Sequence, residues 1–115
     1  MLHHLIDFHA FEVIKNGAVL INTSRGELID EDAMLRSLES GRLSGVGLDV
    51  LANEADKHFD WPQSSEVWRK AASCDNILLV PHIGGATYES MEVTEIFMAR
   101  KLVRYINTND VAGSV

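Results

Sequence analysis

The sequence has little of several features that would point to a compartment or a partner. Its single cysteine, Cys74, excludes an internal disulfide framework and fits a reducing compartment. No apolar run approaches the ~20 residues that cross a bilayer, and the first residues lack the pattern of a signal peptide. Lys and Arg number 10 against 17 Asp and Glu, and the net charge of −7 argues against a basic face for nucleic acid. We therefore expect a soluble cytoplasmic protein with no membrane segment and no nucleic-acid partner.

The histidines lack the spacing of a metal site as well. None lies in an H-x-x-x-H pair, and a single cysteine cannot supply a pair of thiolate ligands. We therefore expect no bound metal. The chain does have the size and apolar content of one domain, because 46% of its 115 residues are hydrophobic, which is enough for a core.

Three short segments rich in apolar residues predict strands. They lie at 18–21, 44–50 and 77–80. The segment 18–21 is apolar on both faces, which is typical of a central parallel strand that helices cover above and below.

Between and after these segments the apolar residues recur at helical spacing. Asp7 can cap a helix, and a second helix is predicted to start near Asp30, where Glu31 and Asp32 suit the positive end of the helix dipole. A long helix is predicted over 87–105, with a shorter one around 66–72. Because strands alternate with helices, the sequence predicts an α/β fold with a parallel sheet and flanking helices.

Polar residues with catalytic potential follow each predicted strand. Arg25 comes after the first strand, Asp49 closes the second and Glu54 follows it, and His82 comes after the third. Ligands of open α/β sheets bind in the crevice outside the carboxyl ends of the strands. We therefore expect these side chains to meet at one edge of the sheet.

These residue types suit chemistry on a small acid. An arginine can bind a carboxylate through two parallel hydrogen bonds, although Arg25 could instead pair with Glu27 or Asp30 at the surface. Histidine, with an unperturbed pKa of about 6.5, can accept and return a proton near neutral pH. A carboxylate such as Glu54 beside His82 would favour the charged imidazole. The alternatives are a capping or core histidine and a solvated loop acid.

Four motifs, in order and at their spacing, resemble one known family. They occupy residues 15–18, 21–26, 45–50 and 81–87, within a similarity that runs from about 4 to 106. The chain resembles the C-terminal half of the coenzyme domain of the D-isomer-specific 2-hydroxyacid dehydrogenases, which include phosphoglycerate, glycerate and D-lactate dehydrogenases. The chain departs from that pattern where Ala55 replaces the usual proline after Glu54, and in an unusual stretch with Trp61 and Trp68.

The resemblance implies a role for each residue at the predicted edge. Arg25, Glu54 and His82 would be catalytic, acting on a small 2-hydroxy or 2-oxo acid. The cofactor-binding residues would be Thr23, Ser24, Arg25, Asp49, His82, Gly84 and Gly85. Asp49 would accept a hydrogen bond from the nicotinamide carboxamide, unless it caps the next turn. A plain turn at Thr23 and Ser24, and ordinary helix entry at the two glycines, are the corresponding alternatives.

The resemblance also implies a partial domain. Residues 1–107 would form half of a doubly wound, Rossmann-type sheet within an NAD-binding domain, followed by a polar tail at 108–115. No G-x-G-x-x-G motif is present, so we expect the isolated chain to bind NAD weakly and to lack activity. An open sheet edge and an uncovered apolar face predict self-association or a homodimer.

Several alternatives stay open at this stage. The expected cofactor is NAD, with NADP as an alternative, because the acid that reads the ribose is not recognisable. The 2-hydroxy acid is not specified either, because no substrate domain is recognisable. Instead of part of an oxidoreductase, the chain could be a dinucleotide-sensing interaction module, as in corepressors that share this fold. It could also be an inactive truncated product.

Overall fold

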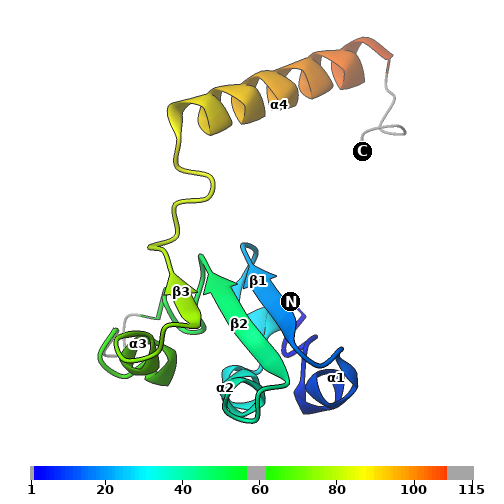
Figure 1. The fold of residues 1–115 in the computed structure, drawn as a ribbon. Helices are drawn as coiled ribbons and strands as arrows, with labels where there is room; N and C mark the ends of the chain where they lie inside the picture. The colour runs from blue at the N-terminus through cyan, green and yellow to red at the C-terminus, as the bar shows by residue number, and fades with distance from the viewer. Residues whose placement is uncertain (1, 57–61, 109–115) are drawn as a thin grey trace. The chain divides into compact units, whose positions relative to one another are not determined.

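The computed structural model describes residues 2–56 and 62–108. It divides the chain into two compact units, Met1–His82 and Ile83–Val115, and each is described by itself. The elements of the first unit are α1 (Phe8–Val13), β1 (Ala18–Asn22), the 3-10 turn η1 (Gly26–Leu28), α2 (Glu31–Glu39), β2 (Leu43–Leu48), α3 (Glu66–Ala71) and β3 (Ile77–Leu79) (Figure 1). The second unit contains α4 (Tyr88–Thr108).

The three strands form one parallel sheet in the order β1-β2-β3. Its register pairs Asn22 of β1 with Leu48 of β2, and Leu48 in turn with Leu79 of β3. The carboxyl ends of all three strands therefore lie at the same level. This confirms the predicted α/β fold and its parallel sheet.

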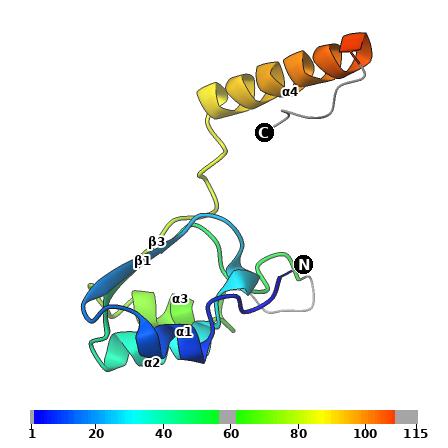
Figure 2. The same cartoon turned by 90° about the vertical axis from the view of Figure 1, so that its right-hand side faces the viewer.

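The helices α1, α2 and α3 lie on one face of the sheet (Figure 2). The helix α2 packs against β2, and α3 packs against β3. The core between these layers includes the fully buried side chains of Met34, Leu43 and Val67. Met34 and Leu35 are buried on the apolar side of α2, so this helix faces the core with one side, as in an amphipathic helix.

The opposite face of the sheet is apolar and exposed. Val19 and Ile21 of β1 are 64% and 71% exposed, and Leu78 of β3 is 66% exposed. Cover on both faces was predicted for β1, but the helices of the first unit cover only one of them. The self-association predicted from an uncovered apolar face stays a prediction.

Short polar side chains begin the helices, as the sequence predicts. The carboxylate of Asp7 accepts a hydrogen bond from the amide of Ala10 (3.0 Å), and Asp30 accepts one from Ala33 (3.0 Å). Both are N-caps. Ser65 caps α3 in the same way, since its hydroxyl accepts from the amide of Trp68 (3.2 Å).

In the second unit, the hydroxyl of Thr87 accepts a hydrogen bond from the amide of Ser90 (3.1 Å) at the start of α4. The helix continues past its predicted end at Tyr105 and reaches Thr108. The remainder of the predicted tail, 109–115, lies outside the described residues. None of the described helices is both long enough and apolar enough to cross a membrane.

The packing of α2 generates a stability prediction. Met34 is 0% exposed, so replacing it with alanine removes buried apolar atoms and leaves a cavity. We expect Met34→Ala to lower the free energy of unfolding by about 2–5 kcal/mol, measured by urea denaturation. Val13 on α1 is 84% exposed and is the control, so Val13→Ala should change that free energy by less than about 0.5 kcal/mol. Equal losses in the two variants would contradict this assignment of the core.

Candidate functional site

The carboxyl edge of the sheet carries most of the predicted site residues. Thr23, Ser24 and Arg25 form the loop directly after β1, Asp49 follows β2, and His82 lies shortly after β3. The pairing of the strands continues into these loops, because the amide of Asp49 donates to the carbonyl of Asn22 (3.0 Å). The parallel sheet thus sets the positions at which these loops begin.

Asn22 shapes the loop after β1. Its side-chain oxygen accepts a hydrogen bond from the amide of Ser24 (3.0 Å), and its amide nitrogen donates to the carbonyl of Arg25 (2.9 Å). Only 7% of Asn22 is exposed, so both bonds are shielded from water. The sequence analysis did not assign Asn22 a role. The signal was available, since an asparagine at a strand end commonly folds the following turn through such bonds.

Arg25 has an exposed side chain, and its guanidinium donates to the carbonyl of Ser24 (2.8 Å). In the described part of the chain it forms no ion pair with Glu27 or Asp30. The surface pairing considered as an alternative is therefore not formed. The charge of Arg25 stays available to an anion.

His82 lies in a tight turn around Pro81. Its amide donates to the carbonyl of Val80 (3.0 Å), and the amide of Val80 donates to the carbonyl of Leu48 (3.0 Å), which ties the turn to β2. The φ angle of His82 is 55°, in the left-handed region that side chains rarely adopt. Such a conformation costs about 1–3 kcal/mol and is concentrated at functional sites. The turn fixes the backbone position from which the imidazole extends.

Glu54 and His82 form a direct pair. The Nδ1 atom of His82 lies 2.6 Å from Oε1 of Glu54. The other carboxylate oxygen of Glu54 accepts a hydrogen bond from the amide of Leu51 (3.3 Å). The side chain of Glu54 is 22% exposed and that of His82 is 52% exposed. The carboxylate is therefore sheltered and fixed, while the imidazole reaches solvent and can meet a ligand through Nε2.

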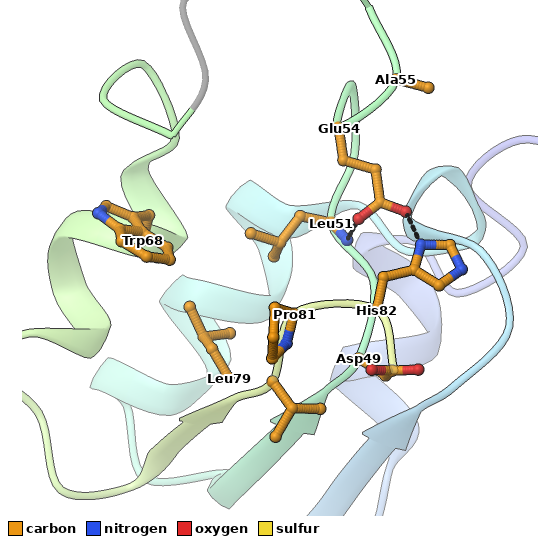
Figure 3. A pocket seen from close by; sticks show the side chains of 9 residues that line it. Asp49, Leu51, Glu54, Ala55, Trp68, Leu79, Pro81 and His82 are labelled. Carbon is orange, nitrogen blue, oxygen red and sulfur yellow. Dashed lines mark hydrogen bonds and ion pairs between the residues drawn. The ribbon is translucent and has the colours of Figure 1, made fainter. Parts of the chain in front are cut away.

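A cavity of about 600 Å³ adjoins this pair (Figure 3). Its polar lining consists of Asp49, Glu54 and His82, and its apolar lining of Leu51, Ala55, Trp68, Leu79, Val80 and Pro81. Asp49 is buried, with 6% of the residue exposed. A mostly apolar cavity with a few convergent polar groups is the usual form of a small-molecule site.

The remaining predicted site residues do not line this cavity. Thr23, Ser24 and Arg25 lie on the loop after β1 and are absent from its described lining. Gly84 and Gly85 belong to the second unit. Trp68, by contrast, lines the cavity although the sequence analysis gave it no place there, and Trp61 lies outside the described residues.

Two acids of the segment after β1 hold the turn that carries Glu54. The amide of Ala52 donates to Glu31 (2.8 Å), and the amide of Asn53 donates to Glu27 (3.2 Å). Burial raises the pKa of the Glu31 carboxyl above its ordinary value of 4.5, against the opposite effect of its bond from Ala52. Nearby carboxylates, including Glu54, also raise the pKa of Glu31.

Comparisons with known proteins agree with this geometry. Residues 2–84 match the family model described as D-isomer specific 2-hydroxyacid dehydrogenase, NAD binding domain. The chain is 35% identical to D-3-phosphoglycerate dehydrogenase 1 of Saccharomyces cerevisiae over 108 residues, which cover 91% of this chain and 23% of that protein.

This chain belongs to the D-isomer-specific 2-hydroxyacid dehydrogenases.

Solved structures of this family have the same fold. The chain is similar to a D-lactate dehydrogenase of Lactobacillus jensenii with NAD⁺ (TM-score 0.70, 31% identity, 91% of this chain and 33% of that one). It is also similar to a family member from Xanthobacter autotrophicus in complex with NADPH (TM-score 0.71, 25% identity, 98% of this chain and 42% of that one). The chain thus spans less than half the length of these 2-hydroxyacid dehydrogenases.

The environment of Glu31 generates a prediction about pH. A raised pKa in the folded chain means that the folded state binds this proton more tightly than the unfolded state. The stability that this proton contributes is present at low pH and is lost as pH rises from about 4.5 through the raised pKa. Glu31→Gln removes the titration and retains an acceptor for Ala52. We expect its melting temperature to exceed that of the wild type near neutral pH, but not well below pH 4.5.

The neighbouring Asp32 is exposed and provides the control. Asp32→Asn removes a carboxylate from the same turn of α2. Its melting temperature relative to that of the wild type should change less with pH than that of Glu31→Gln. If the melting temperatures of Glu31→Gln and the wild type differ by the same amount at all pH values, the prediction is contradicted.

Proposed function

We propose that this chain contributes the proton-transfer pair of a nicotinamide-dependent oxidoreductase that interconverts small 2-hydroxy and 2-oxo acids. The observation that carries the proposal is the 2.6 Å contact between Glu54 and His82 beside the cavity at the carboxyl edge. Membership in the 2-hydroxyacid dehydrogenases supports the proposal that the reaction is oxidation or reduction of such acids. The pair is the arrangement that general acid–base catalysis requires, a titratable imidazole oriented by a carboxylate.

The roles within the pair follow from its geometry. Because Nδ1 of His82 faces Glu54, Nε2 is the nitrogen that would exchange a proton with the substrate oxygen. In reduction, the imidazolium gives its proton to the oxygen of the 2-oxo acid. In oxidation, the neutral imidazole takes the proton of the 2-hydroxyl group. Glu54 holds the ring in place in both directions through its contact with Nδ1.

The residues at the edge also fit the nicotinamide end of the cofactor. The Asp49 carboxylate lines a cavity of about 600 Å³ and has the acceptor chemistry that a carboxamide NH₂ group needs. When bound, NAD or NADP supplies or accepts the hydride. Thr23 and Ser24 are further candidates for cofactor contact, because their small side chains let a ligand approach closely. In the second unit, Gly84 and Gly85 stay candidates on the strength of the family pattern alone.

Arg25 is the proposed anchor for the substrate. Its guanidinium is exposed on the loop after β1 and can bind the substrate carboxylate through two parallel hydrogen bonds. This contact would orient the carbon that receives the hydride.

The proposed pair is tested by two substitutions in a full-length enzyme that carries these residues. His82→Asn should lower kcat for glyoxylate or pyruvate reduction by about 10²–10⁴-fold, because asparagine cannot donate and regain the proton. Glu54→Gln should have a milder effect on rate, because glutamine retains a hydrogen-bond partner for Nδ1 of His82 but lacks the negative charge. Stopped-flow and steady-state kinetics measure both effects.

His9 supplies the control, because it lies on α1 with a side chain that is 85% exposed. His9→Asn should leave the rate and its pH profile unchanged. Full activity of His82→Asn would remove the basis of the proposal. Cofactor binding by the wild type without turnover of any 2-oxo acid would favour a dinucleotide-sensing module instead.

The anchoring role of Arg25 generates a separate prediction. Arg25→Lys retains the charge but replaces two parallel bonds by a point contact, so KM should rise and kcat should fall together. We expect at least about a tenfold loss in kcat/KM, which corresponds to ~1.4 kcal/mol. Arg69 also donates to a backbone carbonyl, that of Gln63, and Arg69→Lys is the matched control. If KM and kcat of Arg25→Lys equal those of the wild type, Arg25 does not anchor the substrate carboxylate.

A further inference from the structure

The turn that carries Glu54 is held from outside itself. Residues 51–54 follow β2, and each of the first three amides of this turn donates to a carboxylate. Leu51 donates to Glu54 within the turn, whereas Ala52 and Asn53 donate to Glu31 and Glu27. Two of the three bonds therefore tie the turn to other elements, one to η1 through Glu27 and one to the start of α2 through Glu31.

Gly26, the first residue of η1, also packs directly against the turn. A Cβ atom at this position would lie 2.0 Å from the carbonyl carbon of Leu51 and 2.2 Å from the nitrogen of Ala52. Real Cβ atoms essentially never come within 3.0 Å of non-bonded heavy atoms, so any side chain at this position would collide with the backbone of the turn. Gly26 is buried, as the close packing of the turn against it requires.

The turn needs such support because of its own backbone. Asn53 has a φ angle of 61°, in the left-handed region that asparagine tolerates better than most residues. This conformation precedes Glu54 directly, so any relaxation of Asn53 would redirect the Glu54 side chain. A shift of about 1 Å in a catalytic group can reduce the rate by about 10²-fold.

We propose that Glu31 is a positioning residue for the Glu54–His82 pair: its bond from Ala52, helped by that of Glu27 from Asn53, holds the turn where Glu54 meets Nδ1 of His82. The inference rests on the proposed function. The placement of Glu31 supports it, because a partly buried carboxylate among other carboxylates is unfavourable for the fold itself. Burial raises the pKa of Glu31 for this reason. A group that disfavours folding and holds a catalytic turn has the character of a functional residue.

The first arm of the test uses the 115-residue chain and NMR. Glu31→Ala should speed hydrogen exchange of the Ala52 amide and shift the ¹⁵N resonance of His82 Nδ1, because Glu54 is no longer held beside it. Glu31→Gln retains the acceptor and should restore both signals toward the wild type. Asp32→Ala removes an exposed acid from the same helix turn and should change neither. Glu27→Ala, which breaks only the 3.2 Å bond, should shift the same signals less and substitutes for Glu31→Ala if that variant does not fold.

The second arm measures reduction of glyoxylate in a full-length enzyme that carries these residues. Glu31→Ala should lower kcat by about 10- to 100-fold with little change in the KM of the cofactor, and Glu31→Gln should recover most of that loss. A lower melting temperature with unchanged kcat and unchanged His82 resonances would show a merely structural role and overturn the inference. Equal effects of alanine and glutamine would show an effect of charge and overturn it as well. A wild-type enzyme without activity would refute the proposed function, while the NMR arm would still decide whether Glu31 positions Glu54.

Discussion

The contact between Glu54 and His82 depends on the pairing of β2 with β3. The two residues are 28 positions apart in the chain, and the parallel pairing of Leu48 with Leu79 brings their loops together. A slip of one residue would move His82 by ~3.3 Å along the strand and turn its neighbours to the other face. The amide of Val80, which donates to the carbonyl of Leu48, extends this register into the histidine turn itself. The register of the sheet is therefore a condition for the chemistry.

The sequence predicts the framework because its signals are local. Apolar runs and capping side chains such as Asp7 and Asp30 act within a few residues, and the helices begin where these side chains predict. The positions of Asp49 and His82 at strand ends follow from the general geometry of parallel sheets. What sequence patterns could not predict are contacts between distant segments. Glu31 looks like an ordinary acid in the first turn of a helix, and only the folded chain brings the Ala52 amide to it.

The cover of only one sheet face by the helices of the first unit is also a feature that local sequence patterns could not predict. The periodicity of β1 shows that both of its faces are apolar, but it cannot show which part of a molecule covers each face. Within the first unit, α1, α2 and α3 cover the face that contains Leu43 and Val46, and Val19 and Ile21 stay exposed. The pattern of one strand therefore predicts that a face is apolar, without identifying the segment that covers it.

The site combines features that each oppose folding. His82 adopts a left-handed backbone, Asn53 does the same, and the burial that raises the pKa of Glu31 disfavours its charge. All of these residues lie at the carboxyl edge, whereas the fully buried side chains of Met34, Leu43 and Val67 lie in the core. The segment from Arg25 to Glu31 joins these features, because it carries the proposed substrate anchor at one end and the support of the Glu54 turn at the other. Movement of this segment would therefore change the position of the substrate carboxylate and that of the proton-transfer pair together. The close packing of Gly26 against Leu51 and Ala52 keeps the two in a fixed relation.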